Sequence, residues 1–139
     1  DVGHRLFTFN KKATGIAISV RDNELFTKQW QTKIPLSTQS PSVIAREAFS
    51  LFEKNYSWQH PIRSITVRAI NLVSLDYDEQ INLFYDAEKN SRIEALDKAV
   101  ENIRSRFGYD AIKNATLLNN PKMPSHSSFD LIMPTGVPR

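Results

Sequence analysis

The residues best suited to recognising a partner lie in one short segment, Gln80-Ile81-Asn82-Leu83-Phe84. Leu83 and Phe84 are large apolar side chains in a stretch that fits neither a helix nor a strand. Exposed anchors of this kind usually fill a pocket on another protein. The amide of Gln80 can form hydrogen bonds at the rim of such a pocket. The segment therefore indicates a docking peptide, the alternative being a loop that turns Leu83 and Phe84 into its own core.

Residues that could carry catalysis or bind a metal ion are scattered. His4, His60 and His126 lack metal-ligand spacing, and the acidic stretch 76–79 lacks the glycine and distal glutamate of a calcium loop. There is no cysteine, no Gly-x-Ser-x-Gly elbow and no phosphate-binding glycine loop. No apolar run approaches the ~20 residues of a membrane helix. We expect no active site, metal or cofactor in this chain, and a cytosolic location.

Positive charge is concentrated in the first half of the chain. Residues 1–75 contain ten Lys or Arg and five Asp or Glu, a balance of +5, and residues 76–139 contain eight and ten, a balance of −2, which agrees with the total of +3. A basic segment is typical of proteins that bind a polyanion such as nucleic acid. A solvated surface with a chance asymmetry is the alternative.

Two segments alternate between apolar and polar residues, as half-buried β-strands do. Their polar sides consist of Gly15, Ala17, Ser19 and Arg21 in one segment and of Ser64, Thr66 and Arg68 in the other. Small side chains would let a phosphate backbone approach the main-chain amides, and hydroxyl and arginine groups donate hydrogen bonds to it. No aromatic residue lies on these sides, which disfavours base stacking of the kind used by RNA-binding sheets. The alternative is the plain polar side of an antiparallel sheet.

The elements that would position these residues form an α+β arrangement. Periodicity predicts the end of a helix over 2–10, strands over 14–21, 25–34 and 62–73, and helices over 41–57 and 91–108. The turn signal at 22–24 predicts a hairpin and therefore antiparallel pairing. We expect an antiparallel sheet of three to four strands with two helices packed on one face, plus a C-terminal helix.

End signals and apolar spacing refine these elements. Ser40 is a good N-cap and Pro41 suits a first helical turn. Ser91 and Glu94 predict a capping box for the last helix, which Gly108 would end. The side chains expected to pack inward are Val2, Leu6 and Phe9; Phe26, Trp30 and Ile34; and Ala45, Ala48, Phe49, Phe52 and Tyr56.

In this order and spacing, several stretches resemble the C-terminal "little-finger" domain of Y-family DNA polymerases, closest to the Gram-positive DNA-repair members of the UmuC/DinB group. The stretches are 11–20, 50–52, 61–67, 71–73, 80–84 and 104–108, followed by Ala111, Ile112 and Ala115. Segment 80–84 is similar to the bacterial sliding-clamp motif, in which Leu is more frequent where Ile81 stands. The likeness covers residues 1 to 118, without the family's first edge strand. The chain opens with Asp1 and lacks an initiator Met, so we expect a fragment of a longer protein.

The resemblance implies a four-stranded sheet backed by two helices that grips template-primer DNA beside the thumb. It also implies that the magnesium-binding catalytic residues lie in a palm domain outside this chain, which should not polymerise DNA by itself. The expected organisation is a DNA-binding domain over 1–75, a linker with the clamp motif over 76–89, a helical extension over 90–118 and a flexible tail over 119–139.

The resemblance and the charge pattern together assign candidate contacts. The DNA-binding candidates are Lys11, Lys12, Arg21, Lys28, Lys33, Arg63, Ser64, Thr66 and Arg68, and the clamp-binding candidates are Gln80, Ile81, Asn82, Leu83 and Phe84. The implied partners are duplex template-primer DNA, the bacterial sliding clamp, and the palm, finger and thumb domains of the same polypeptide, with no membrane.

Two other functions remain open on the sequence. An RNA-binding α/β domain would expose aromatic residues on the sheet, and Trp30 is the doubtful case because the facing of its strand is ambiguous. A protein-interaction module without a nucleic-acid role would show no salt-dependent retention on DNA.

Overall fold

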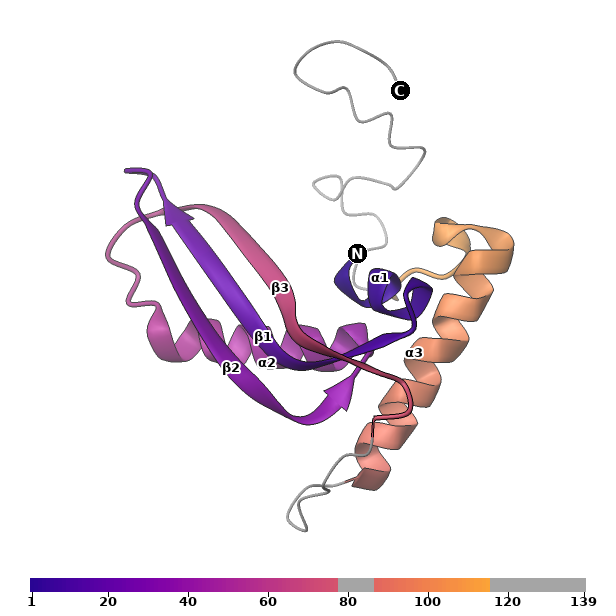
Figure 1. Ribbon diagram of the computed structural model, residues 1–139. Helices are drawn as coiled ribbons and strands as arrows, with labels where there is room; N and C mark the ends of the chain where they lie inside the picture. The colour runs from indigo at the N-terminus through magenta and orange to yellow at the C-terminus, as the bar shows by residue number, and fades with distance from the viewer. Residues whose placement is uncertain (78–86, 116–139) are drawn as a thin grey trace. The chain divides into compact units, whose positions relative to one another are not determined.

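The computed structural model describes residues 1–77 and 87–115 (Figure 1). Its elements are α1 (Val2–Thr8), β1 (Lys11–Asp22), β2 (Thr27–Thr38), α2 (Pro41–Asn55), β3 (Ile62–Ser74), α3 (Ala87–Phe107) and a short 3-10 turn (Tyr109–Ala111). The chain divides into two compact units, Asp1–Lys98 and Ala99–Arg139, and α3 runs across the division. The candidate clamp peptide and the predicted tail over 119–139 lie outside the described residues.

The three strands form one antiparallel sheet in the order β2-β1-β3. The predicted hairpin joins β1 to β2, and Asp22 closes its turn because the Asp22 carboxylate accepts a hydrogen bond of 2.9 Å from the Phe26 amide. The expected α+β class with an antiparallel sheet is therefore confirmed. β1 extends beyond both of its predicted ends and β3 by one residue, whereas β2 begins two residues later than predicted and ends four residues later. Backbone pairing continues past the residues that alternate cleanly, and residues 25–26 belong to the turn.

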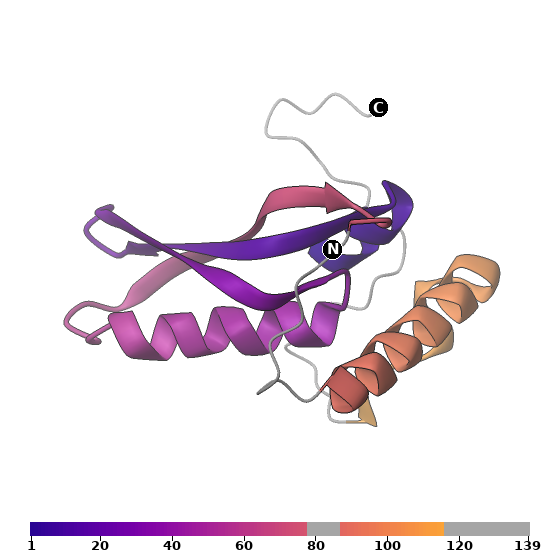
Figure 2. The same ribbon diagram turned by 60° about the horizontal axis from the view of Figure 1, so that its bottom comes forward.

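Helix α2 lies along one face of the sheet (Figure 2). Ile16, Ile18 and Val20 of β1 point to this side and are buried with Val43 and Ile44 of the helix. Because β1 is the central strand, its aliphatic side is covered completely. On the edge strand β3, by contrast, Ile65 remains about half exposed.

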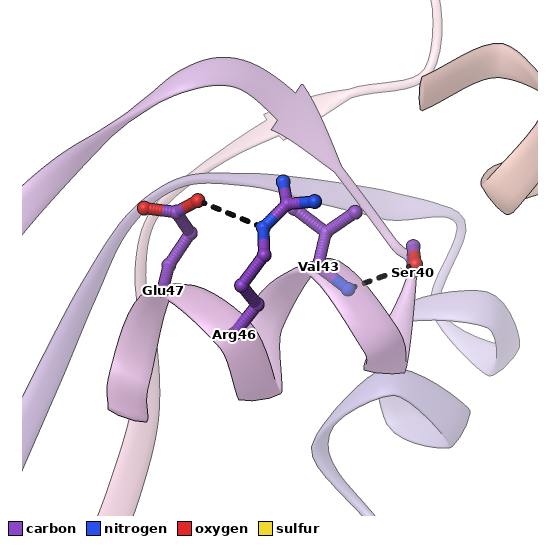
Figure 3. A network of polar contacts seen from close by, with 4 residues as sticks. All are labelled: Ser40, Val43, Arg46 and Glu47. Carbon is purple, nitrogen blue, oxygen red and sulfur yellow. Dashed lines mark hydrogen bonds and ion pairs between the residues drawn. The ribbon is translucent and has the colours of Figure 1, made fainter. Parts of the chain in front are cut away.

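Helix α2 begins as the sequence predicts. The hydroxyl of Ser40 accepts a hydrogen bond of 3.2 Å from the amide of Val43 (Figure 3). Pro41 follows at the first helical position. One turn further, Arg46 and Glu47 form an exposed ion pair at 3.4 Å. This start directs Val43, Ile44, Ala48, Leu51 and Phe52 toward the core.

Several side chains predicted to be buried are exposed. Ala45 and Phe49 lie outside the buried face of α2, which is rotated toward Ile44 and Leu51. Phe9 follows the end of α1 and is 71% exposed, and Phe26 lies in the hairpin turn instead of β2 and is 67% exposed. Apolar spacing alone does not distinguish these positions from core positions, because residues at an element's end can turn away.

The predicted capping box of the last helix is wrong. Helix α3 begins at Ala87, so Ser91 lies in its second turn, and the Glu94 carboxylate accepts a hydrogen bond of 2.6 Å from the Thr38 hydroxyl. One turn later, Asp97 accepts hydrogen bonds from the hydroxyls of Ser40 and Ser42. A carboxylate at the N-terminus of α2 is favourable because the first amides of a helix lack partners there.

The C-terminal end of α3, in the second unit, agrees with the signal predicted at Gly108. Gly108 follows the last residue of α3 with a φ of 92°, and its amide donates to the Arg104 carbonyl at 2.9 Å. A positive φ suits glycine, so Gly108 ends the helix as expected.

Candidate nucleic-acid interface

Side chains from all three strands meet on the side of the sheet opposite α2. The strand register aligns them in four rows across β2, β1 and β3. We call this surface the open sheet face; its rows are Lys33, Gly15 and Ile70; Gln31, Ala17 and Arg68; Gln29, Ser19 and Thr66; and Thr27, Arg21 and Ser64.

The open sheet face carries cations and no acid. Of its twelve residues, Arg21, Lys33 and Arg68 are basic, none is acidic, and all three basic side chains are exposed. The outer positions add the amides of Gln29 and Gln31 and several hydroxyls, which donate hydrogen bonds to phosphate oxygens. The face therefore offers a strip of donors to a negatively charged backbone.

The centre of the face is closed, contrary to the expected approach of phosphate to main-chain amides. Strand β1 pairs on both sides, so its amides are engaged in the ladder. Gly15 and Ala17 are buried, and a Cβ on Gly15 would lie 2.9 Å from Cγ1 of Ile70 and 3.1 Å from the carbonyl oxygen of Thr32. Gly15 is therefore small because its neighbours cover it, and the donors are the side chains around it.

Five of the nine predicted DNA contacts come together on this face. They are Arg21, Lys33, Ser64, Thr66 and Arg68. Thr27, Gln29 and Gln31 were not among the predicted contacts, because the facing of β2 is ambiguous in the sequence. Their spacing of two residues from Lys33 is the signal that would have found them.

The other four predicted contacts lie elsewhere. Lys28 pairs with Val20, which places it on the helix side of the sheet. Arg63 is exposed at the register shift between the pairs of Arg21 and Asp22. Lys11 and Lys12 pair with Ser74 and Val73 at the far end of β1, beyond the four rows, so they are not among the twelve residues of the open sheet face.

Trp30 does not contribute an aromatic surface to the open sheet face. It pairs with Ile18 on the helix side and packs against the core. None of the twelve residues of the face is aromatic. The arrangement therefore lacks the stacking platform with which RNA-binding sheets hold bases.

Among residues 1–77 and 87–115, no group of three or more His, Asp or Glu side chains could hold a metal ion. In the same ranges, no helix is long and apolar enough to cross a membrane.

Comparison with known proteins matches the sheet-bearing part of the chain to one family. Residues 1–83 match the model described as the impB/mucB/samB family C-terminal domain. The chain is 37% identical over 120 residues to a DNA polymerase IV of Acetivibrio thermocellus, covering 86% of this chain and 30% of that protein. It is 30% identical over 118 residues to a DNA polymerase IV of Clostridium acetobutylicum, covering 85% of this chain and 29% of that protein.

A third relative extends the same pattern. A DNA polymerase IV of Clostridium kluyveri is 25% identical over 131 residues, which covers 87% of this chain and 32% of that protein. The chain thus spans 29% to 32% of the length of these curated relatives.

Proposed function

Because the chain belongs to the impB/mucB/samB family as a C-terminal domain of the Y-family polymerases, we propose that it holds duplex DNA for a lesion-bypass DNA polymerase. In this proposal the open sheet face contacts the phosphate backbone. Nucleotidyl transfer and its magnesium ions belong to the palm domain, as the family resemblance implies. The chain then serves as a non-catalytic grip.

The observation that carries the proposal is the group of three cations on a face without an acid. Lys33, Arg68 and Arg21 lie in the first, second and fourth rows. The four rows run from Gly15 to Arg21 of β1, a distance of six residue steps, or roughly 20 Å at ~3.4 Å per step. One DNA strand presents a phosphate every ~3.4 Å along the helix axis, so several phosphates fit within the length of the face.

Contacts of this kind have a measurable salt signature. Neutralising three phosphates gives a slope of about −2.7 in log K against log salt concentration on duplex DNA. Since the face reads no base edges, the affinity should be independent of sequence. Fluorescence anisotropy of labelled duplexes of two unrelated sequences at several salt concentrations measures both properties.

The matched test compares two arginines on different elements. Arg68→Ala removes a cation of the open sheet face, whereas Arg46→Ala removes an exposed cation of α2. We expect Arg68→Ala to weaken duplex binding and to reduce the salt slope by about one. Equal losses in the two variants would contradict an interface on this face.

The second part of the proposal is a tether to the bacterial sliding clamp through residues 80–84. The apolar anchors Leu83 and Phe84, the resemblance to the clamp motif and the position between β3 and α3 support it. Tethering raises the local concentration of a polymerase on DNA even when the peptide binds weakly.

The tether has a separate test. Replacing Leu83 and Phe84 with Ala should abolish binding to the purified clamp, because hot-spot anchors carry most of the affinity of a short peptide. The same double variant should bind duplex DNA like the unchanged chain. Clamp binding that survives the double substitution in surface plasmon resonance would refute the tether and leave the DNA grip intact.

A further inference from the structure

A cluster of aromatic side chains lies at the end of the sheet where the β1–β2 turn meets the loop between α2 and β3. We call it the aromatic end; it consists of Phe26, Phe49, Phe52, Tyr56 and Trp58. The Asn23 amide donates to the Pro61 carbonyl at 3.0 Å, and His60 lies 3.5 Å from Glu24, so the two loops are joined. Figure 2 shows both loops at the same end of the sheet.

The aromatic end is ordered internally but open to solvent. Phe52 and Tyr56 stack with ring centroids 5.3 Å apart, and Trp58 stands nearly perpendicular to both at 5.6 and 5.5 Å. Trp58 is nevertheless 69% exposed and Phe49 60% exposed. A rigid cluster of exposed rings is suited to binding another flat or apolar group.

The backbone supports a role beyond packing. Trp58 has a φ of 53° and Leu25, in the adjoining turn, has a φ of 72°. Bulky residues rarely adopt this left-handed conformation, and such strain is concentrated at binding and catalytic sites. Strain at an exposed aromatic residue indicates that the position of the ring matters.

Polar groups next to the rings favour a nucleic acid as the occupant. A shallow notch is lined by Phe26 and Tyr56 together with Lys28, Ser57, Gln59 and His60. Asp22 also lines it; its carboxylate accepts a hydrogen bond from the Phe26 amide, and the residue is buried. The exposed groups beside the two aromatic rings are the cation of Lys28 and the donors of Ser57 and Gln59.

The aromatic end lies at the same end of the sheet as the last row of the open sheet face. Arg21 and Ser64 form the last row of that face, and Asp22, paired with Ile62, leads directly into the two loops. Arg63, which lies between Ile62 and Ser64 in the sequence, is exposed. Lys28 and the rings of α2 lie on the helix side, so a DNA strand that leaves the open sheet face at this row reaches them by passing around the end of the sheet.

We propose that the aromatic end binds unpaired nucleotides next to the duplex, with Trp58 and Phe26 stacking on bases and Lys28 contacting a phosphate. Bases inside a duplex already stack on each other, so exposed rings select single-stranded DNA. The inference rests on the proposed function, because DNA is the ligand in both. In this proposal Lys28, which lies outside the open sheet face, contacts DNA at the notch.

The test uses the two tryptophans of the chain. In a Trp30→Phe variant, Trp58 is the only tryptophan, and oligothymidylate should quench its emission in a saturable manner. A duplex with a single-stranded overhang should bind about tenfold more tightly than a blunt duplex, since one stacked base contributes on the order of a tenfold gain or more. Absence of both quenching and overhang preference would overturn the inference.

Matched variants separate binding from folding. Trp58→Ala and Trp58→Gly should reduce the affinity for the overhang duplex to that for the blunt duplex. Phe9→Ala removes an equally exposed aromatic ring of another element and should leave the preference unchanged. A similar loss in Phe9→Ala would refute a specific site.

The outcomes also distinguish this inference from the proposed function. Blunt-duplex binding that depends on Arg68 but shows no overhang preference would refute the aromatic end as a site and leave the DNA grip standing. If no duplex binds, the proposed grip fails, and the quenching of Trp58 by oligothymidylate still decides whether the aromatic end binds single strands.

Discussion

The open sheet face and the aromatic end are neighbouring surfaces of one domain, and they offer different kinds of contact to a ligand. The face is built on paired strands, carries donors and cations at fixed intervals, and lacks aromatic residues. The aromatic end combines the last turns of α2 with two loops, exposes the rings of Phe26, Phe49 and Trp58, and has positive φ at Trp58 and at the adjoining Leu25. A regular strand spacing suits a repeating phosphate backbone, whereas a cluster of exposed rings suits individual bases. Four substitutions can break or sharpen this contrast.

Thr66→Glu should have the largest effect on the open sheet face. It places a carboxylate one row from Arg68 and one row from Arg21. At ~8 Å from a DNA phosphate and an effective dielectric of ~20, the new carboxylate repels that phosphate by about 2 kcal/mol. This corresponds to a roughly thirtyfold loss of affinity for duplex DNA. Fluorescence anisotropy at low salt measures the loss.

The matched control is Thr8→Glu, which adds the same charge at an exposed position of α1. We expect it to leave duplex affinity almost unchanged. If both variants bind equally weakly, long-range charge explains the affinity and the open sheet face has no special part in it.

Gly15→Ala tests why the centre of the face is small. The added Cβ would meet Ile70 and the carbonyl oxygen of Thr32, and the latter cannot move without shifting the strand. Overpacking of this kind costs about 1.5 kcal/mol, which lowers the melting temperature by roughly 5–10 °C. Circular dichroism measures this. A variant of unchanged stability but weakened DNA binding would show that Gly15 serves the approach of DNA instead.

Leu25→Gly tests the strain beside the aromatic end. Relief of the left-handed conformation should outweigh the entropy of glycine and raise the free energy of unfolding by about 0.5–1 kcal/mol. Glu24→Gly, one residue earlier and outside the positive-φ positions of the described chain, should lower it. Destabilisation by Leu25→Gly in urea unfolding would mean that Leu25 packs against its surroundings.

Trp58→Gly should have the smallest effect on stability. Loss of the contacts with Phe52 and Tyr56 is offset by relief of its positive φ, so we expect a change below about 0.5 kcal/mol. Trp58→Ala loses the ring without that relief and should be less stable by about 1 kcal/mol. Equal stability of the two variants in thermal unfolding would exclude strain at this residue.

The sequence predicts the open sheet face better than the aromatic end, for a physical reason. Alternation identified Ser19, Arg21, Thr66 and Arg68 as residues of polar strand sides, because a strand that covers a core must place every second residue outward. Which residues of β2 and β3 lie beside a given residue of β1 depends on the pairing register of strands that are distant in the sequence. The local pattern of a strand does not determine this register. Alternation on β2 is unclear because both of its sides carry polar residues.

The aromatic end could not be found from spacing. Phe26 and Phe49 fit apolar positions of a strand and a helix, so they were interpreted as core, and only the structure shows that their elements end or rotate away. Similarly, Ser91 and Glu94 match a capping box by spacing, although Glu94 accepts its hydrogen bond from Thr38. A local motif does not reveal a partner that is 56 residues away in the chain.

Lys11 of β1 pairs with Ser74, the last residue of β3, and this pairing fixes the point at which the chain leaves the sheet. Leu83 follows Tyr77, the last described residue of this stretch, by six positions. Whatever path those residues take, six of them span no more than roughly 20 Å. If the proposed clamp contact is made, the pocket that receives Leu83 must therefore lie within roughly 20 Å of Tyr77, close to the point where the chain leaves β3.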